Sequence, residues 1–234
     1  MTRDRALVIV AKAPQPGRTK TRLSPPLSLA DAAALYEAFL VDTTQAALAL
    51  SWERVTLLHP DLPGVAQALS VLVSDAAHLQ PQDGVGLGAA LSSAFHTHLA
   101  AGFDRVVLIA SDTPTLPNAL IQAASASLDH EDLVIGPSAD GGYYLIGMRT
   151  FYPALFKGIL WSTQYVLEQT LERARALALR VCSLPEWYDV DTVAELYRLA
   201  ADLEQLPDDV APQTRARLRS IAAALQLTTS SSGA

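Results

Sequence analysis

The sequence predicts a single α/β domain whose central strands are covered by helices on both faces of a sheet. Residues 6–11 and 106–110 are short aliphatic runs without polar alternation, which is typical of strands buried on both sides. Helical patterns begin near Ser28, Leu87 and Pro117, so that strands and helices alternate along the chain. With 234 residues, half of them hydrophobic, the chain is long enough for one such domain with a large core.

The other expected elements follow from the same patterns, and capping residues mark two of the helices. Ser28 and Thr192 each stand three residues before a carboxylate, at the spacing of a capping box. Further strands are expected at residues 54–58, 70–73, 132–136, 143–148 and 178–184, the last with a buried Cys182. Helices are expected at residues 28–50, 87–101, 117–128, 163–177 with Ser162 as N-cap, and 212–225, with one more after Thr192. We take residues 1–227 as the domain and residues 228–234 as a small-residue tail that is expected to be disordered.

Composition and charge argue against several classes of protein. The net charge is -7 and no long basic run exists, which argues against nucleic acid or an anionic membrane as a partner. The single cysteine excludes an internal disulfide and any site built from several cysteines, and the five histidines lack metal-site spacing. There is no signal-peptide pattern and no apolar run of roughly twenty residues, so we expect a cytoplasmic protein. A serine-nucleophile elbow and a dinucleotide fingerprint after the first strand are both missing, which argues against serine hydrolysis and hydride transfer.

The loop after the first expected strand concentrates positive charge in an acidic protein. Four cations lie within eleven residues, among two prolines and a glycine: Lys12, Arg18, Lys20 and Arg22. Such cations, together with free backbone N–H groups, can wrap a phosphate chain, and we interpret the loop as a phosphate-binding site. The alternative is a solvated basic loop. It is not a Walker loop, because the Gly-x-x-x-x-Gly-Lys-Ser/Thr pattern is absent.

A glycine-spaced turn and a carboxylate at a strand end are two further candidate site features. Gly84 begins a run of glycines at every second position before the helix near Leu87, and such a turn lets the backbone pass close to a ligand. Gln82 precedes this turn and is a candidate contact to a nucleobase or ribose. Asp112 follows the central strand on a short turn stiffened by Pro114, where a carboxylate can hold a divalent metal over a diphosphate. The alternative is that Asp112 only caps the turn.

A second glycine turn supplies candidate residues for binding an acceptor or a sugar. Asp140, Gly141 and Gly142 have strong turn chemistry between two expected strands. This leaves Asp140 and the tyrosine pair, Tyr143 and Tyr144, to line the same crevice. An acidic group beside an aromatic face suits a hydroxylated ligand. The segment before the next helix adds Trp161, Ser162 and Thr163. Trp161 is interpreted as either a lid on the acceptor pocket or a hydrophobic staple.

Two alternating aspartates precede the helix that starts after Thr192. If the segment is extended, Asp189 and Asp191 point to the same side, where they are a candidate second half of a metal site. For Asp191, capping of the following helix is the stronger alternative.

Taken together and in order, five segments resemble a known family. They are Lys12 with residues 17–23, residues 111–114, residues 136–147, residues 161–163 and residues 189–192. The combination resembles little-characterised bacterial glycosyltransferases of the GT-A nucleotide-diphospho-sugar transferase superfamily, often labelled a domain of unknown function, some of them assigned to arsenosugar biosynthesis. The resemblance covers about residues 5–200. It implies a Rossmann-like three-layer α/β/α sandwich with a mostly parallel sheet, a nucleotide site at the end of the first strand, and a carboxylate-held Mg²⁺ or Mn²⁺.

The same superfamily includes nucleotidyltransferases such as the molybdenum-cofactor and phospholactate guanylyltransferases. In those relatives a basic loop like residues 18–22 binds the triphosphate, and an aspartate placed like Asp112 binds the metal. Many glycosyltransferases of this fold have Asp-x-Asp, whereas residues 111–113 supply one carboxylate. The resemblance therefore requires a second metal ligand, for which Asp191 and Asp140 are the candidates, unless phosphate and water hold the metal.

Three hypotheses about function follow. The first is metal-dependent transfer of a sugar from a nucleoside diphosphate sugar to a small acceptor, with a cation on Asp112 stabilising the leaving group and Asp140 orienting hydroxyls or acting as a base. The second is nucleotidyl transfer from an NTP to a phosphorylated small molecule, with release of pyrophosphate. The third is a nucleotide-binding or scaffold protein without catalysis. The expected partners of either enzyme are a nucleotide or nucleotide sugar and a small-molecule acceptor.

Overall fold

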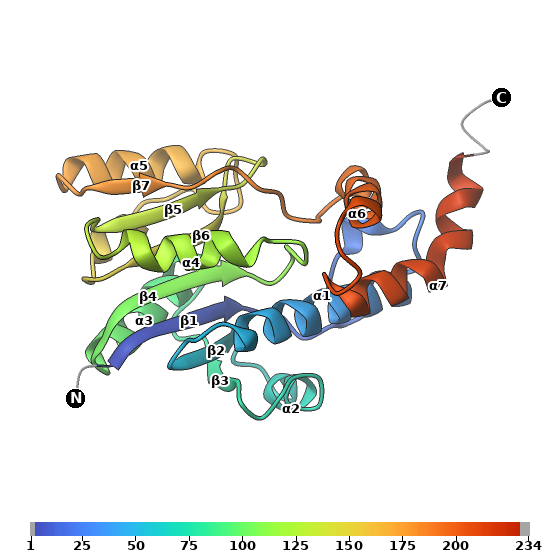
Figure 1. The fold of residues 1–234 in the computed structure, drawn as a ribbon, viewed down its shortest axis with the longest axis horizontal. Helices are drawn as coiled ribbons and strands as arrows, with labels where there is room; N and C mark the ends of the chain where they lie inside the picture. The colour runs from blue at the N-terminus through green and yellow to red at the C-terminus, as the bar shows by residue number, and fades with distance from the viewer. Residues whose placement is uncertain (1–2, 230–234) are drawn as a thin grey trace.

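The computed structural model describes residues 3–229, which form a seven-stranded sheet covered by helices. The strands are β1 (Arg3–Val10), β2 (Arg54–His59), β3 (His78–Pro81), β4 (Phe103–Ala110), β5 (Leu133–Pro137), β6 (Tyr143–Met148) and β7 (Val181–Ser183). The α-helices are α1 (Leu29–Ala49), α2 (Val65–Ser70), α3 (Leu87–Ala100), α4 (Asn118–Ser127), α5 (Val166–Ala176), α6 (Val193–Gln205) and α7 (Pro212–Thr229), and two 3₁₀ helices are η1 (Thr21–Leu23) and η2 (Pro153–Phe156). The strand order is β3-β2-β1-β4-β6-β5-β7 (Figure 1).

The sheet is mostly parallel, as predicted. β1 pairs in parallel with both β2 and β4, so that Val8 lies opposite Thr56 and Leu108. β6 runs antiparallel to both of its neighbours, β4 and β5. The chain builds outward from β1 to β3 and then returns to add β4 on the other side of β1. The strand order therefore changes direction between β1 and β4, and in open α/β sheets ligands bind beyond the carboxyl ends of the strands at such a point.

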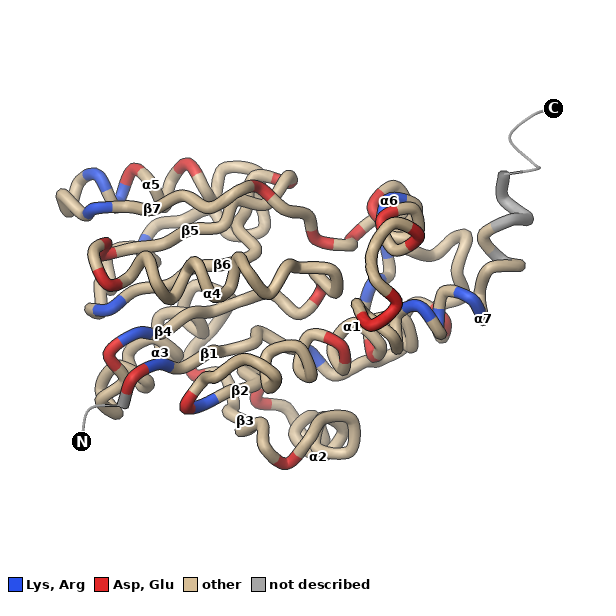
Figure 2. The backbone as a smooth tube through the Cα atoms, in the orientation of Figure 1, with Lys and Arg blue, Asp and Glu red and all other residues tan. Residues whose placement is uncertain are grey.

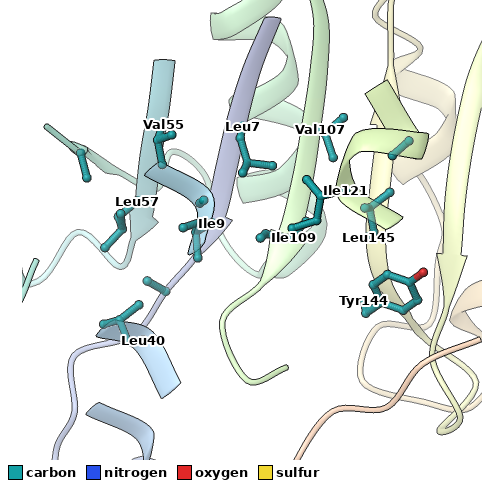
Figure 3. Packing of buried hydrophobic residues seen from close by; sticks show 14 of the residues in the cluster. Leu7, Ile9, Leu40, Val55, Leu57, Val107, Ile109, Ile121, Tyr144 and Leu145 are labelled. Atoms are coloured by element: carbon teal, nitrogen blue, oxygen red, sulfur yellow. The ribbon is translucent and has the colours of Figure 1, made fainter. Parts of the chain in front are cut away.

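Helices cover both faces of the sheet, because the central strands are apolar on both sides. Leu7 and Ile9 of β1 belong to one buried cluster, which includes residues of α1, α2 and α4 (Figure 3). Ala6 and Val8 of the same strand belong to a second cluster, which includes residues of α3, α5 and η2. Alternate residues of one strand thus enter two cores, which confirms the predicted three-layer α/β/α sandwich.

A third apolar cluster joins three helices beyond the carboxyl edge of the sheet. The first half of α1 packs there with α6 and α7, around residues such as Phe39 and Leu199. Figure 1 shows these helices extending to one side of the sheet. The buried carboxylate of Asp42 fixes the start of α7, because it accepts hydrogen bonds from the backbone N–H groups of Gln213 (3.0 Å) and Thr214 (2.7 Å).

Three local predictions are corrected by the structure. Residues 70–73 are not a strand: Ser70 ends α2, Val71 is 78% exposed, and the third strand is instead the polar edge strand β3. Ser162 is not an N-cap, because its φ of 63° is left-handed and α5 begins at Val166. Cys182 in β7 is half-buried and not buried.

The end of the chain differs from the prediction as well. α7 continues to Thr229, so residues 228 and 229 of the expected tail belong to the helix, and residues 230–234 lie outside the described part of the chain. None of the helices within residues 3–229 has the length and apolar character that crossing a bilayer requires.

Candidate active site at the carboxyl edge of the sheet

The carboxyl edge of the sheet brings together charged residues from opposite ends of the chain. The ammonium Nζ of Lys20 lies 2.7 Å from Oδ2 of Asp112 and 2.6 Å from Oδ1 of Asp191. Lys20 follows β1, Asp112 follows β4, and Asp191 lies between β7 and α6. In Figure 2 the strands of the sheet carry few charges between their ends, and acidic and basic positions gather in the connecting segments. The cluster of Lys20, Asp112 and Asp191 therefore lies at the edge of the sheet where the strand order predicts a ligand site.

The basic loop is folded so that Lys20 points inward. Its turn is closed by hydrogen bonds from the N–H groups of Arg18 and Thr19 to the carbonyl of Gln15, both 3.0 Å. The buried hydroxyl of Thr19 donates to the carbonyl of Ala13 and accepts from the N–H of Gln15. Lys20 then adopts a left-handed φ of 51° before η1, and its side chain is only 6% exposed.

The other three cations of the loop face solvent. Lys12, Arg18 and Arg22 are exposed, and no salt bridge involves them within residues 3–229. The positive charge of Lys12 nevertheless contributes to lowering the pKa of Asp112, so it acts on the same site. One cation of the loop thus binds protein carboxylates, while three remain available to an anionic ligand.

A buried hydroxyl pair connects the loops that follow β1 and β4. Tyr36 of α1 accepts a hydrogen bond from the N–H of Lys12 (2.9 Å), and its hydroxyl lies 2.7 Å from Oγ of Ser111. Ser111 in turn donates to the carbonyl of Val10 (2.7 Å). Burial raises the pKa of Tyr36 to about 12, so its hydroxyl stays neutral and donates to Ser111. This network fixes the residue before Asp112 against the start of the basic loop.

The carboxylates of the site differ in protonation because their surroundings differ. Burial opposes ionisation of Asp112, but the charge and hydrogen bond of Lys20 outweigh it and lower its pKa. Burial likewise opposes the charged form of Lys20, yet Asp112 and Asp191 raise its pKa. Asp189 forms no salt bridge within residues 3–229, and burial, and next the charge of Asp112, raise its pKa to about 8.

The sequence predicts Asp189 together with Asp191 as half of a metal site and does not distinguish the two. The structure buries it beside the site, where Oγ of Ser138 donates to its Oδ2 at 2.9 Å. Its Oδ1 is buried and has no hydrogen-bond partner among the described residues. A bridge between Ser138 and Trp187 holds the extended segment against the end of β5, and it makes Asp189 more buried than Asp191. The alternation in the sequence was the signal for this residue.

The donor chemistry of the site fits Mg²⁺ or Mn²⁺, although the carboxylates are not gathered around one point. Asp112, Asp189 and Asp191 offer the carboxylate oxygens that these cations prefer, and Oδ1 of Asp189 is buried without a partner. Among the described residues, no three acidic, histidine or cysteine side chains are arranged to hold a metal ion. The ammonium of Lys20 lies between two of the candidates. A metal would require this ammonium to move, or would be held largely by phosphate and water.

The second glycine turn is tied to α5. Gly141 has a φ of +87°, and a Cβ on it would lie 2.2 Å from the carbonyl oxygen of Gln164. Its own carbonyl accepts from the N–H of Leu167 (2.9 Å). Oδ1 of Asp140 accepts from the N–H of Gly142 (2.9 Å), and its charge contributes to the raised pKa of Asp189. Asp140 is therefore a turn residue and also a neighbour of the acidic cluster.

The predicted acceptor residues after this turn have mixed positions. Tyr143 packs against the core between the sheet and α5, and burial raises the pKa of its hydroxyl. Tyr144 alternates to the other face of the sheet and is 1% exposed, so the prediction that it lines the crevice is wrong. Ser162 and Thr163 are exposed, and Oγ1 of Thr163 donates to the carbonyl of Leu160. Trp161 is half-buried against the core and lies over Gly88, where a Cβ would come within 2.3 Å of its indole Nε1.

The contact between Trp161 and Gly88 joins the segment before α5 to the glycine-spaced turn at the start of α3. Gly84 has a φ of +85°, and a Cβ on it would lie 2.7 Å from that of Ala89 at the start of α3. Gln82 is half-buried, and its N–H donates to the carbonyl of His59 at the end of β2. The predicted nucleotide turn thus follows β3 at the same edge as the acidic cluster, with Trp161 packed on its helix.

The fold and the site define a class of transferases that move nucleotidyl or glycosyl groups. The chain belongs to the family described as "Uncharacterized protein conserved in bacteria (DUF2064)", whose model matches residues 41–163. It is 34% identical to a crystal structure from Desulfovibrio desulfuricans G20 that was provisionally assigned as a nucleotide-diphospho-sugar transferase, with a TM-score of 0.89 over 95% of this chain and 97% of that one.

Two other similarities are to proteins described as nucleotidyltransferases. The chain is 29% identical over 180 residues to a 2-phospho-L-lactate guanylyltransferase from Methanothermobacter thermautotrophicus, which is 76% of each chain. A nucleotidyl transferase structure from the same genus matches with a TM-score of 0.57 at 17% identity, over 87% of this chain and 98% of that one. The second similarity shows the fold alone. The family model, the Desulfovibrio desulfuricans structure and the guanylyltransferase similarity together confirm the predicted superfamily.

Proposed function

We propose that the protein is a metal-dependent nucleotidyltransferase, which joins an NTP to a phosphorylated small molecule and releases pyrophosphate. The observation that carries the proposal is the meeting of Lys20 with Asp112 and Asp191, beside a loop with three exposed cations. A triphosphate carries more negative charge than a diphosphate, and this density of cations suits it. The similarity to a guanylyltransferase supports the same reaction class.

The reaction needs charge neutralisation more than proton transfer. A phosphate oxygen of the second substrate forms a bond to the α-phosphorus, and the bond from that phosphorus to the bridging oxygen of the β-phosphate breaks. The electron pair leaves with pyrophosphate, whose growing charge Lys12, Arg18 and Arg22 would neutralise. The attacking oxygen is already ionised at neutral pH, so no general base is needed, and the engagement of Asp140 in a turn is compatible with this.

The acidic residues would supply the metal site. Asp112 and Asp191 would hold Mg²⁺ or Mn²⁺, with Asp189 beside them, and the bound cation would act as a Lewis acid toward the phosphate oxygens. Lys20 would then contact phosphate. Tyr36 and Ser111 would keep the basic loop and Asp112 in register across the crevice.

Transfer of a sugar from a nucleoside diphosphate sugar is the second candidate. It is favoured by the similarity to the Desulfovibrio desulfuricans structure, which covers nearly the whole chain. In that reaction the same cations would neutralise a nucleoside diphosphate leaving group, and the exposed Asp140 would orient an acceptor hydroxyl.

A substrate screen separates the two reactions. The protein is incubated with Mg²⁺ or Mn²⁺, each of the four NTPs, and a panel of sugar phosphates and phosphorylated hydroxy acids, and pyrophosphate is measured. Parallel incubations hold nucleoside diphosphate sugars with hydroxylated acceptors, and nucleoside diphosphate is measured. Nucleotidyl transfer predicts metal-dependent pyrophosphate release that Asp112→Asn abolishes and Asp132→Asn, at a surface ion pair with Arg180, leaves unchanged. Nucleoside diphosphate release without pyrophosphate would overturn it in favour of glycosyl transfer.

A further inference from the structure

Lys20 is the cation that holds the carboxylates of the site together in the ligand-free protein. Its ammonium makes two short ion pairs, at 2.7 Å to Asp112 and 2.6 Å to Asp191. Its side chain is 6% exposed, whereas those of Asp112 and Asp191 are 27% and 44% exposed. The lysine is thus the most buried of the three side chains, and the two carboxylates are more accessible to a ligand.

A divalent cation on the same two carboxylates would lie close to this ammonium. Charges of the same sign a few ångströms apart repel strongly where solvent screening is weak. Oδ2 of Asp112 and Oδ1 of Asp191 already accept hydrogen bonds from Lys20, which reduces the negative charge that these oxygens offer to a metal. Among the described residues, the three carboxylates form no ready-made metal cluster.

The lysine has an alternative partner in the proposed substrate. Its flexible four-carbon side chain starts from the basic loop, on which Lys12, Arg18 and Arg22 remain exposed. A polyphosphate drawn to those cations would bring anionic oxygens near Lys20 and replace the carboxylates as its partner. The carboxylates released in this way would then be available to the metal that the polyphosphate carries.

We infer that Lys20 competes with the divalent cation for Asp112 and Asp191, so that the free protein excludes the metal and admits it together with a nucleotide. The inference rests on the proposed function, because it assumes a nucleotide and a metal at this site. It gives Lys20 two positions: between the carboxylates in the free protein, and on phosphate in the complex. Lys20 therefore couples the binding of the metal to the binding of the nucleotide. This coupling adds to the affinity that the metal and the nucleotide have for each other.

The test measures Mn²⁺ binding to the full chain by electron paramagnetic resonance, without nucleotide and with a saturating NTP. The variants are Lys20→Met and Lys20→Gln, and Arg22→Met is the control that removes a cation from the same loop without touching a carboxylate. Loss of Lys20 is expected to tighten Mn²⁺ binding without nucleotide by roughly tenfold or more, since a nearby positive charge is removed. Arg22→Met is expected to change it by less than about threefold, because exposed charges are well screened. Lys20→Gln keeps a polar side chain and provides the measurement if Lys20→Met does not fold.

A second readout follows thermal unfolding of the same proteins. Without Mn²⁺ the Lys20 variants are expected to melt below the wild type, since their carboxylates repel each other, and Mn²⁺ is expected to raise their melting temperature more than that of the wild type. If the wild type binds Mn²⁺ with an NTP but the Lys20 variants bind Mn²⁺ alone no tighter than the wild type, the competition is refuted and the proposed function stands. If no protein binds Mn²⁺ even with an NTP, both are refuted.

Discussion

Removing the hydroxyl of Tyr36 tests whether the crevice is organised by the buried network between the two loops. In Tyr36→Phe the N–H of Lys12 loses its acceptor and Oγ of Ser111 loses a donor, at a position that is 2% exposed. A hydrogen bond contributes about 1 kcal/mol, and a buried N–H without a partner costs about 1–3 kcal/mol. We therefore expect the free energy of unfolding to fall by about 2–3 kcal/mol in urea titrations.

Tyr144→Phe is the matched control for this prediction. Its ring is equally buried, but its hydroxyl donates a single hydrogen bond, to the carbonyl of Pro185, away from the basic loop. This variant should lose about 1 kcal/mol and keep its nucleotide affinity, whereas Tyr36→Phe should also weaken nucleotide binding, because the loop is no longer fixed. A double-mutant cycle with Ser111→Ala should give a coupling energy of about 1 kcal/mol. Equal losses in both tyrosine variants, with no coupling, would refute the network as an organiser of the site.

Three further predictions concern the fold. Asp42→Ala removes the carboxylate that caps α7, and the free energy of unfolding measured in urea should fall by about 1–2 kcal/mol. Asp31→Ala, which removes a partly exposed ion pair with Arg217, should cost less. For His98, burial first, and then the charges of Arg54 and His78, lower the pKa below 6.5, so stability should decline as the pH falls below about 6.5, where the unfolded imidazole takes up a proton first. In urea titrations between about pH 5 and 8, where histidine titrates, the wild type should lose stability relative to His98→Gln as the pH falls, and this difference removes the opposite contribution of Asp189. Gly88→Ala should displace Trp161 and change its fluorescence, because the added Cβ would lie 2.3 Å from the indole Nε1. The free energy of unfolding should fall, although alanine normally stabilises a helix by about 1 kcal/mol over glycine. An unchanged fluorescence spectrum would contradict the contact.

The parts of the fold that the sequence predicted are those in which local chemistry agrees with the tertiary environment. Strands such as β1 and β4 are apolar on both faces because helices cover both, and that pattern is visible without partners. Thr192 and Glu195 form the predicted capping box. The prediction failed where pairing overrides composition: β3 is a polar edge strand, held by its register with β2, and residues 70–73 have strand-forming side chains but no strand to pair with.

In the candidate site, too, contacts between segments far apart in the sequence were only partly predictable. That the basic loop and Asp112 would share one edge follows from their places at strand ends, and the ion pair with Lys20 confirms it. Lys20 also binds Asp191, because the segment after β7 runs back across the edge of the sheet toward β4. No local sequence pattern predicts this return of the chain. The same return makes Asp189 a buried acid with a raised pKa and Asp191 the partner of a cation, although the two alternate in sequence like equivalents.

The position of Lys20 argues for function, because it is an inefficient way to stabilise a fold. Burying an ammonium and its partner carboxylates costs several kcal/mol of hydration, by order of magnitude, and apolar side chains of similar volume often fill such a gap with equal or greater stability. The neighbouring helical extension shows that the chain does use apolar packing beside the crevice, around residues such as Leu23 and Tyr188. A fold that needed only cohesion here could extend that cluster. Instead the crevice contains one buried cation, three carboxylates and an unpaired oxygen of Asp189, and this is a charge distribution that becomes favourable when a polyphosphate and its metal enter.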